Sequence, residues 1–136
     1  MDQKLWKRLK INMDCKRTYI LSECAIYDLE QIVIYYSINL SNKKYATELH
    51  QKIEYFFDTL TIFPNMGKNI SEQNTKNDYN IKKIIVEGYI IYYLFEEEKD
   101  LITILRIASF KRNEAIILEQ IKSTLNWVLL VIIMNL

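Results

Sequence analysis

Residues 81–110, IKKIIVEGYIIYYLFEEEKDLITILRIASF, decide the fold of this chain. They divide into three runs that are rich in β-branched and aromatic residues, which is the composition of strands. Glu87 and Gly88 separate the first two runs as a tight turn, and charged residues 96–100 form a longer turn before the third. Because connections this short join antiparallel neighbours, the stretch predicts a three-stranded antiparallel meander.

Apolar residues stand at both alternating sets of positions in these three runs. Both faces of the sheet should therefore be at least partly covered. A single helical hairpin can cover one face, so the apolar C-terminal segment 114–136 is a candidate cover for the other. After Asn113, which can cap a helix, residues at helical spacing predict a helix from about 114 to 130.

The chain before the meander predicts a strand and two helices. Thr18–Leu21 is expected to form a strand, and Ser22 to cap a helix that starts near Glu23. A break and a second N-cap follow at Ser41-Asn42. The apolar stripe expected on the first helix is Leu29, Ile32, Val33, Tyr36 and Leu40. The stripe expected on the second is Ala46, Leu49, Ile53, Phe56, Leu60 and Phe63. Helices joined by so short a break should pack as an antiparallel hairpin.

The second helix is expected to end at Pro64, which pushes the preceding residue out of helical geometry. Gly67 then offers a residue that can take a positive φ. Residues 68–80 are polar and without periodicity, which indicates a surface loop. The expected organisation is an N-terminal extension at 1–16, one domain at 17–113 and an apolar helical tail at 114–136.

Composition excludes several classes of protein. The 136 residues are enough for one domain with one core, and half of them are hydrophobic, so the chain is not expected to be disordered. The net charge of +1 leaves any anion site to a local patch. Cys15, Cys24 and His50 make neither a disulfide framework nor a metal site, so no metal or cofactor is expected. No secretory signal is visible, and reduced thiols in the cytoplasm are expected. The apolar run 127–134 is far shorter than a membrane helix needs.

Five features of the sequence occur in one order. They are LSECAIYDLEQIVIYY at 21–36, LTIFPNMGK at 60–68, the basic Lys82, the Gly88-Tyr89 pair followed by Tyr93, and RIASFKRN at 106–113. Together they resemble the RelE/ParE family of bacterial toxins, and Asp28-Leu29 matches the family's Asp-Leu pair. The resemblance covers roughly residues 17–113 and is nearer to the ParE-like branch.

The resemblance implies an α+β fold, with a two-helix hairpin packed on a small, mainly antiparallel sheet of about four strands and an extra C-terminal helix. It also implies the toxin component of a type II toxin–antitoxin module, associated with growth inhibition and plasmid stabilisation. The implied partner is a cognate antitoxin protein, which binds through an amphipathic helix or an added strand. A homodimer or a heterotetramer with the antitoxin is compatible with this.

Two activities occur among such toxins. RelE-like members are ribosome-dependent mRNA endonucleases, which need cations at the phosphate and a general acid and base. Here Lys83 matches a catalytic lysine, but Ile90 stands where such enzymes commonly have Arg. Ile116 and Ile117 stand where a late tyrosine is expected. The nuclease residues that the resemblance offers are therefore an incomplete set: Lys83, Arg106, Lys111 and Arg112.

ParE-like members inhibit DNA gyrase by binding, which needs no catalytic constellation. This is the favoured hypothesis, with the mRNA endonuclease and an inactive antitoxin-binding relic as alternatives. Whether the chain is an enzyme is left open. The candidate target-binding residues are Lys82, Tyr89, Arg106, Lys111 and Arg112.

Some of these candidates also have an ordinary structural interpretation. In a regular strand Arg106 shares its face with Ile102, Ile104 and Ala108, and an unpaired buried charge costs several kcal/mol. It therefore either contacts a target or forms an ion pair, for which Glu87 and the Glu96–Glu98 cluster are the expected partners. Lys82 and Lys83 should point to opposite faces of the sheet. Tyr93 and one of Tyr89 and Tyr92 are expected in the core.

Overall fold

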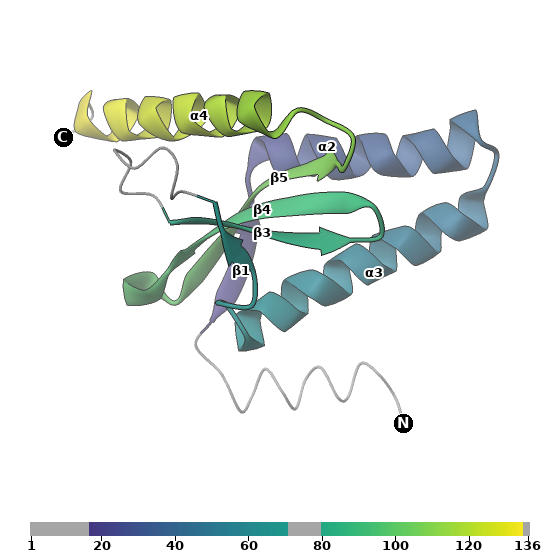
Figure 1. Ribbon diagram of the computed structural model, residues 1–136, viewed down its shortest axis with the longest axis horizontal. Helices are drawn as coiled ribbons and strands as arrows, with labels where there is room; N and C mark the ends of the chain where they lie inside the picture. Colours follow the sequence, from purple (N-terminus) through teal and green to yellow (C-terminus); the bar gives the residue numbers. More distant parts are fainter. Residues whose placement is uncertain (1–16, 71–79, 135–136) are drawn as a thin grey trace.

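The computed structural model describes residues 17–70 and 80–134, and the surroundings of side chains as far as Leu125. The elements within these ranges are β1 (Thr18–Leu21), α2 (Glu23–Ile34), a π-helical turn (Tyr35–Asn39), α3 (Lys43–Ile62), β2 (Lys68–Asn69), β3 (Ile81–Val86), β4 (Tyr89–Glu96), a 3-10 turn (Glu97–Lys99), β5 (Leu101–Ser109) and α4 (Glu114–Met134). Figure 1 shows the sheet at the centre, with α4 along the top, α2 to the right and α3 at the lower right. The two clusters of buried residues place the α2–α3 hairpin and α4 on opposite faces of the sheet. The predicted α+β class, the hairpin and the C-terminal helix are confirmed.

The sheet has five strands in the order β1-β5-β4-β3-β2. β3, β4 and β5 form the predicted antiparallel meander, and β1 pairs with β5 in parallel. The strand β2 pairs with Lys82 and Lys83 of β3, in a place where the sequence predicted a surface loop. Two polar residues carry no periodicity, so this strand left no signal in the sequence. Residues 71–79 of the predicted loop lie outside the described residues.

The pairing of β4 with β5 contains an irregularity at Arg106. Tyr92 lies opposite Arg106, whereas Tyr93 lies opposite Ile104, so Leu105 is an extra residue in β5. A bulge of this kind changes which side chains share a face. The expectation that Arg106 shares a face with Ile102 and Ile104 is therefore wrong, whereas Ala108, which like Arg106 follows the bulge, remains on the same face as Arg106.

The residues that were predicted to cap the helices and to end the second one do so in the structure. The Ser22 hydroxyl accepts a hydrogen bond from the Ala25 N–H at 3.1 Å and so caps α2. Asn42 caps α3 by accepting from the Tyr45 N–H at 3.1 Å. The helix α3 ends at Ile62, just before Pro64, as predicted.

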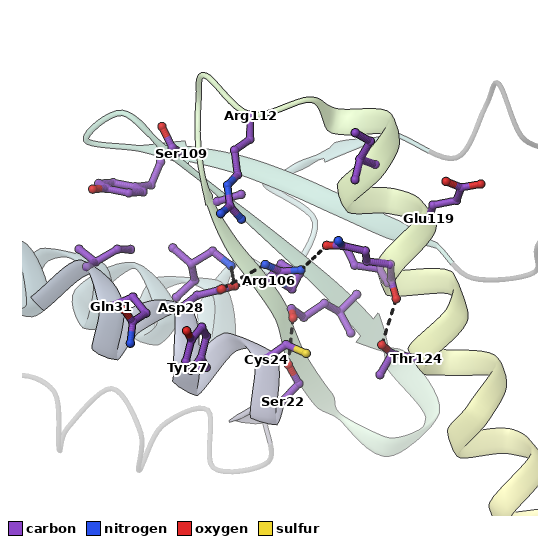
Figure 2. Close-up of a pocket in the computed structure, with 18 of the residues that line it drawn as sticks. Ser22, Cys24, Tyr27, Asp28, Gln31, Arg106, Ser109, Arg112, Glu119 and Thr124 are labelled. Carbon is purple, nitrogen blue, oxygen red and sulfur yellow. Dashed lines mark hydrogen bonds and ion pairs between the residues drawn. The ribbon is translucent and has the colours of Figure 1, made fainter. Parts of the chain in front are cut away.

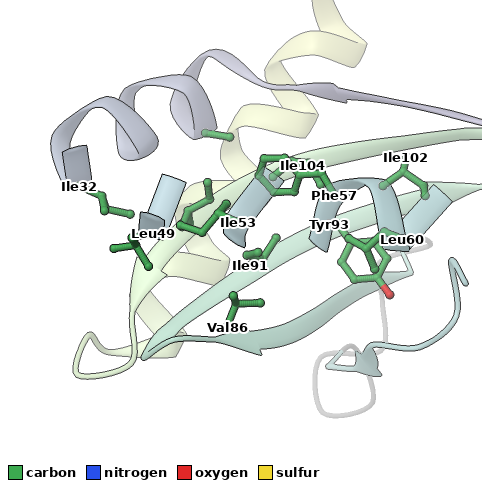
Figure 3. Packing of buried hydrophobic residues seen from close by; sticks show 12 residues of the cluster. Ile32, Leu49, Ile53, Phe57, Leu60, Val86, Ile91, Tyr93, Ile102 and Ile104 are labelled. Carbon is green, nitrogen blue, oxygen red and sulfur yellow. The ribbon is translucent and has the colours of Figure 1, made fainter. Parts of the chain in front are cut away.

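The first core lies between the hairpin and one face of the sheet (Figure 3). Its buried members are Ala25, Ile32, Leu49, Ile53, Phe57, Leu60, Val86, Ile91, Tyr93, Ile102, Ile104 and Ile107. On α3, Phe57 is 1% exposed and takes the place that the sequence assigned to Phe56. Phe63 was also misassigned, because it lies past the end of α3 and is 59% exposed. Spacings of three and four both suit a helical stripe, so only packing could choose between the adjacent phenylalanines.

The second core lies between the other face of the sheet and α4. Ile117 and Ile121 of α4 are each 3% exposed. They pack in one cluster with Ile81, Ile90, Tyr92, Leu105 and Ala108. The tail thus covers the face that the hairpin leaves open, and Tyr92 and Tyr93 are the two core tyrosines.

Gly67 is required by a close approach rather than by its backbone conformation. A Cβ at this position would lie 2.5 Å from the Tyr93 hydroxyl oxygen and 2.8 Å from the Lys83 carbonyl oxygen. The same hydroxyl accepts a hydrogen bond from the Gly67 N–H at 2.9 Å and donates one to the Pro64 carbonyl at 2.8 Å. Among the described glycines, positive φ occurs at Gly88 in the β3–β4 turn, so Gly67 does not use the freedom of backbone conformation that glycine offers.

Replacing Gly67 by alanine should lower the free energy of unfolding by about 1–3 kcal/mol, because the added methyl group overpacks the site. Urea unfolding measures this loss. Gly88→Asn is the matched control, since Gly88 has no atom within 4 Å of a new Cβ and asparagine tolerates its φ of +84°. Equal stability of the two variants would contradict the proposed role of the close approach.

Candidate functional site

An ion pair between α2 and β5 forms the centre of the candidate site. Arg106 Nε donates to Asp28 Oδ2 at 2.7 Å, and Nη2 donates to Oδ1 at 3.1 Å. The two side chains are 13% and 8% exposed. Gln120 of α4 accepts from Arg106 Nη1 at 2.7 Å. The hydrogen bond to the Asp28 carboxylate is the main reason why the pKa of Arg106 is raised.

The ion pair lies beside the part of β5 that extends beyond the end of the neighbouring strand β1. β1 pairs with β5 as far as Leu21 opposite Ile104, so the later edge of β5 needs other partners. Ser22 donates its hydroxyl to the Leu105 carbonyl at 2.9 Å, and Asp28 Oδ2 accepts from the Ile107 N–H at 3.0 Å. One carboxylate therefore neutralises Arg106 and satisfies a buried backbone donor.

Of the two interpretations of Arg106, the ion pair is confirmed, but its expected partners, Glu87 and the Glu96–Glu98 cluster, are wrong. Glu87 pairs with Lys52 at 3.3 Å and Glu96 with Lys99 at 3.2 Å, both away from Arg106. The signal that could have found Asp28 was its position within an otherwise apolar helix face, next to Leu29. From the sequence alone, Asp28 contributed to the family resemblance and had no assigned role.

A groove of about 1180 Å³ runs over this ion pair, between α2 and α4 (Figure 2). Residues 105–109 of β5 form its floor. Tyr27 and Tyr35 on the α2 side and Ile116 on the α4 side are exposed to 61%, 46% and 53%. Arg112, in the turn between β5 and α4, also lines the groove.

The structure brings together three of the five candidate target-binding residues. Tyr89, Arg106 and Arg112 line the groove. Lys111 is exposed beside Arg112 but does not line it. Lys82 lies elsewhere, with its ammonium group 2.9 Å from Asn69 Oδ1 of β2.

Two of the four candidate nuclease residues, Lys83 and Arg106, are engaged by side chains of α4. Lys83 lies opposite Tyr92 on β4, which in turn lies opposite Arg106, so the three form a row across adjacent strands. Glu114 accepts from Lys83 Nζ at 2.8 Å and from the Tyr92 hydroxyl at 3.3 Å. Burial, and then the Glu114 charge, raise the pKa of Tyr92. Both cations of the row are thus paired with a carboxylate.

Two further searches cover the described ranges alone. Within residues 17–70 and 80–134, His, Cys, Asp and Glu side chains do not gather in a group of three that could hold a metal ion. In the same ranges, every helix is too short or too polar to cross a membrane.

Comparisons with known proteins identify similar sequences and folds. Residues 19–114 match the family described as ParE toxin of type II toxin-antitoxin system, parDE. Among solved structures, the chain is similar to one described as the chromosomal ParDE TA system from P. aeruginosa. The two share 18% sequence identity at a TM-score of 0.56, over 71% of this chain and 98% of that one. At that identity the likeness supports the fold alone. A search of curated proteins found no match.

Arg106→Met should destabilise the fold by about 3–5 kcal/mol, because it leaves the Asp28 carboxylate buried without its cation. Adding Asp28→Asn should restore part of that loss, since an amide oxygen can still accept from the Ile107 N–H. Chemical unfolding of the single and double variants measures the coupling. Arg112→Met, at an exposed arginine of the same groove, is the control and should change stability by less than about 0.5 kcal/mol. A loss of that small size for Arg106→Met would refute the assigned role.

Proposed function

Because this chain belongs to the family of ParE toxins of type II toxin–antitoxin systems, we propose that it inhibits growth by binding its target, and that this target is DNA gyrase. A cognate antitoxin is the partner that such a module requires. We also propose that residues 17–113 form the toxin domain and that the tail from 114 onward modifies its surface.

The pairing of Lys83 and Arg106 with carboxylates is the observation that supports inhibitory binding. A nuclease of this kind stabilises negative charge at phosphorus with unpaired cations. Lys83 is held by Glu114 at 2.8 Å and Arg106 by Asp28 at 2.7 Å. Each cation would have to leave a close carboxylate before it could meet a phosphate. A binding inhibitor needs no such rearrangement.

The proposed contacts with the target are exposed cations at the end of β5. Lys111 and Arg112 lie in the turn that leads to α4, and both are exposed. Arg106 acts through its pairing with Asp28 as a positioning residue, since it is 13% exposed. Tyr89 lines the groove beside Arg112 and adds an aromatic surface. Lys82 lies on β3 and does not line the groove, so it is a lesser candidate.

One observation keeps the mRNA endonuclease as a second candidate. Lys83, Tyr92 and Arg106 occupy one cross-strand row, and Glu114 and Gln120 of α4 contact the two ends of that row. If α4 moved away, Lys83 and the Tyr92 phenol would become available together beside Arg106, which would still be paired with Asp28 of α2. The inactive relic remains the third candidate, and growth on induction tests it.

Purified protein at micromolar concentration should inhibit DNA supercoiling by gyrase. The double variant Lys111→Glu/Arg112→Glu should be weaker by about tenfold or more, because reversed charges repel a complementary surface. Lys43→Glu/Lys44→Glu, at two exposed lysines that begin α3, is the charge-matched control and should retain full potency.

Gyrase that is unaffected by the wild-type protein would refute the proposed target. Primer extension on translated mRNA would then distinguish the candidates, since discrete cuts within codons are produced by the endonuclease alone. Induction without growth arrest and without cuts would indicate the inactive relic.

A further inference from the structure

Three turns lie together at one end of the molecule, in the right half of Figure 1. They are the connection from α2 to α3 with the first residues of α3 (35–44), the β3–β4 turn (87–88) and the connection from β5 to α4 (110–113). We call the surface that these three segments form the basic end. It has no part in the proposals made above except for Lys111 and Arg112.

The basic end is one surface because its turns contact one another. The rings of Tyr36 and Tyr45 meet below the tip of the helical hairpin, with their centroids 4.8 Å apart. The Tyr36 hydroxyl oxygen lies 3.5 Å from that of Tyr89, the first residue of β4. The Phe110 N–H then donates to the Gly88 carbonyl at 2.9 Å.

This end carries a local excess of positive charge. Four of its cations are exposed, and within residues 17–70 and 80–134 their side chains form no hydrogen bond or ion pair: Lys43, Lys44, Lys111 and Arg112. Segments 31–47 and 109–113 contain no Asp or Glu. The carboxylate of Glu87 belongs to the same surface but is already paired with Lys52 at 3.3 Å. A chain of net charge +1 therefore still presents an anion-binding patch here.

Large apolar side chains are exposed among these cations. Ile38 is 67% exposed, Leu40 51% and Phe110 62%. None of the three belongs to the core under the hairpin or to the core under α4. Ile38 and Leu40 stand at the end of the π-helical turn, which the Leu40 N–H closes by donating to the Tyr35 carbonyl at 3.0 Å. Apolar side chains gathered on a surface mark a site that binds a protein or a membrane.

The shape and composition of the basic end favour a membrane. Ile38, Leu40 and Phe110 stand on two separate turns and line neither the groove between α2 and α4 nor the one between α2 and α3. A protein partner would need a matching hollow for each side chain, whereas a fluid lipid headgroup layer closes around them. Basic residues beside aliphatic and aromatic ones are the composition of segments that bind the interface of anionic membranes. Nucleic acid would use the cations and leave the apolar side chains in water.

We propose that the basic end binds the surface of membranes that contain anionic lipids. Ile38, Leu40 and Phe110 enter the headgroup layer, and the four cations lie against lipid phosphates. This inference goes beyond the proposed function and requires neither gyrase nor an antitoxin. Because Lys111 and Arg112 are also the proposed target contacts, a membrane-bound molecule does not offer them to gyrase.

The full chain should sediment with vesicles of phosphatidylcholine and phosphatidylglycerol, and not with vesicles of phosphatidylcholine alone. At about 150 mM salt, where exposed charges act over about 8 Å, Lys43→Glu/Lys44→Glu should weaken this binding by about tenfold or more. Lys68→Glu/Lys99→Glu makes the same change in net charge at exposed lysines of β2 and of the β4–β5 turn, and should stay within about threefold of wild type.

The apolar contribution is tested at constant charge. Ile38→Ser/Leu40→Ser should weaken vesicle binding by about tenfold or more, because less apolar surface enters the headgroup layer. Ile20→Ser/Ile26→Ser is the matched control, at isoleucines of β1 and α2 that are 50% and 46% exposed.

A fluorescent dye that senses polarity gives an independent readout of insertion. Attached to Ile38→Cys in a full-length Cys15→Ser/Cys24→Ser chain, its emission should shift to the blue when anionic vesicles are added. The same dye on Ile20→Cys should not shift. Equal spectra with and without vesicles at Ile38→Cys would contradict insertion of the hairpin tip.

Each other outcome bears on the inference. Wild type that does not sediment with anionic vesicles would overturn it, and so would equal binding by wild type and both variants of the basic end. Without vesicle binding, loss of gyrase inhibition in Ile38→Ser/Leu40→Ser would indicate a protein partner at this end. Loss of duplex DNA binding in Lys43→Glu/Lys44→Glu would then indicate nucleic acid. Wild type that binds vesicles but leaves supercoiling unaffected would refute the proposed target and leave this inference intact.

Discussion

The carboxylate of Asp28 fixes how α2, β5 and α4 are arranged relative to one another. It joins α2 to β5 through Arg106 and through the Ile107 N–H, and Arg106 extends the connection to Gln120 of α4. A buried ion pair adds little net stability compared with apolar packing, but removing one partner is costly. Its value here lies in specifying one arrangement, because a different register of β5 would leave the buried carboxylate without a partner.

The bulge in β5 determines which way Arg106 of the ion pair points. Leu105 is the extra residue that interrupts the alternation of side chains, so Ile104 and Ile107 both reach the core under the hairpin. Arg106 is thereby turned toward α2 and α4 rather than into either apolar cluster. The bulge lies where β1 ends. From this point on, the backbone groups at the edge of β5 form hydrogen bonds with side chains instead of with a neighbouring strand.

The helix α4 changes both the chemistry and the shape of the surface. Glu114 and Gln120 engage the two cations that a nuclease would need free. Ile117 and Ile121 close the second core, and the outer residues of the same helix form a wall of the groove. One helix thus supplies polar partners for both cations and a wall of the groove.

The sequence by itself determined the features that depend on neighbouring residues. These are the strand runs, the Ser22 and Asn42 caps, the stop before Pro64 and the covering tail. Local sterics and hydrogen bonding act within a few residues, so their effects can be predicted from the sequence. Tertiary structure alone decided the bulge, the burial of Phe57 in place of Phe56, and the close approach at Gly67. It also chose Asp28 for Arg106 across a separation of 78 residues. Such choices follow from packing and charge pairing between distant segments, which become neighbours only once the chain has folded.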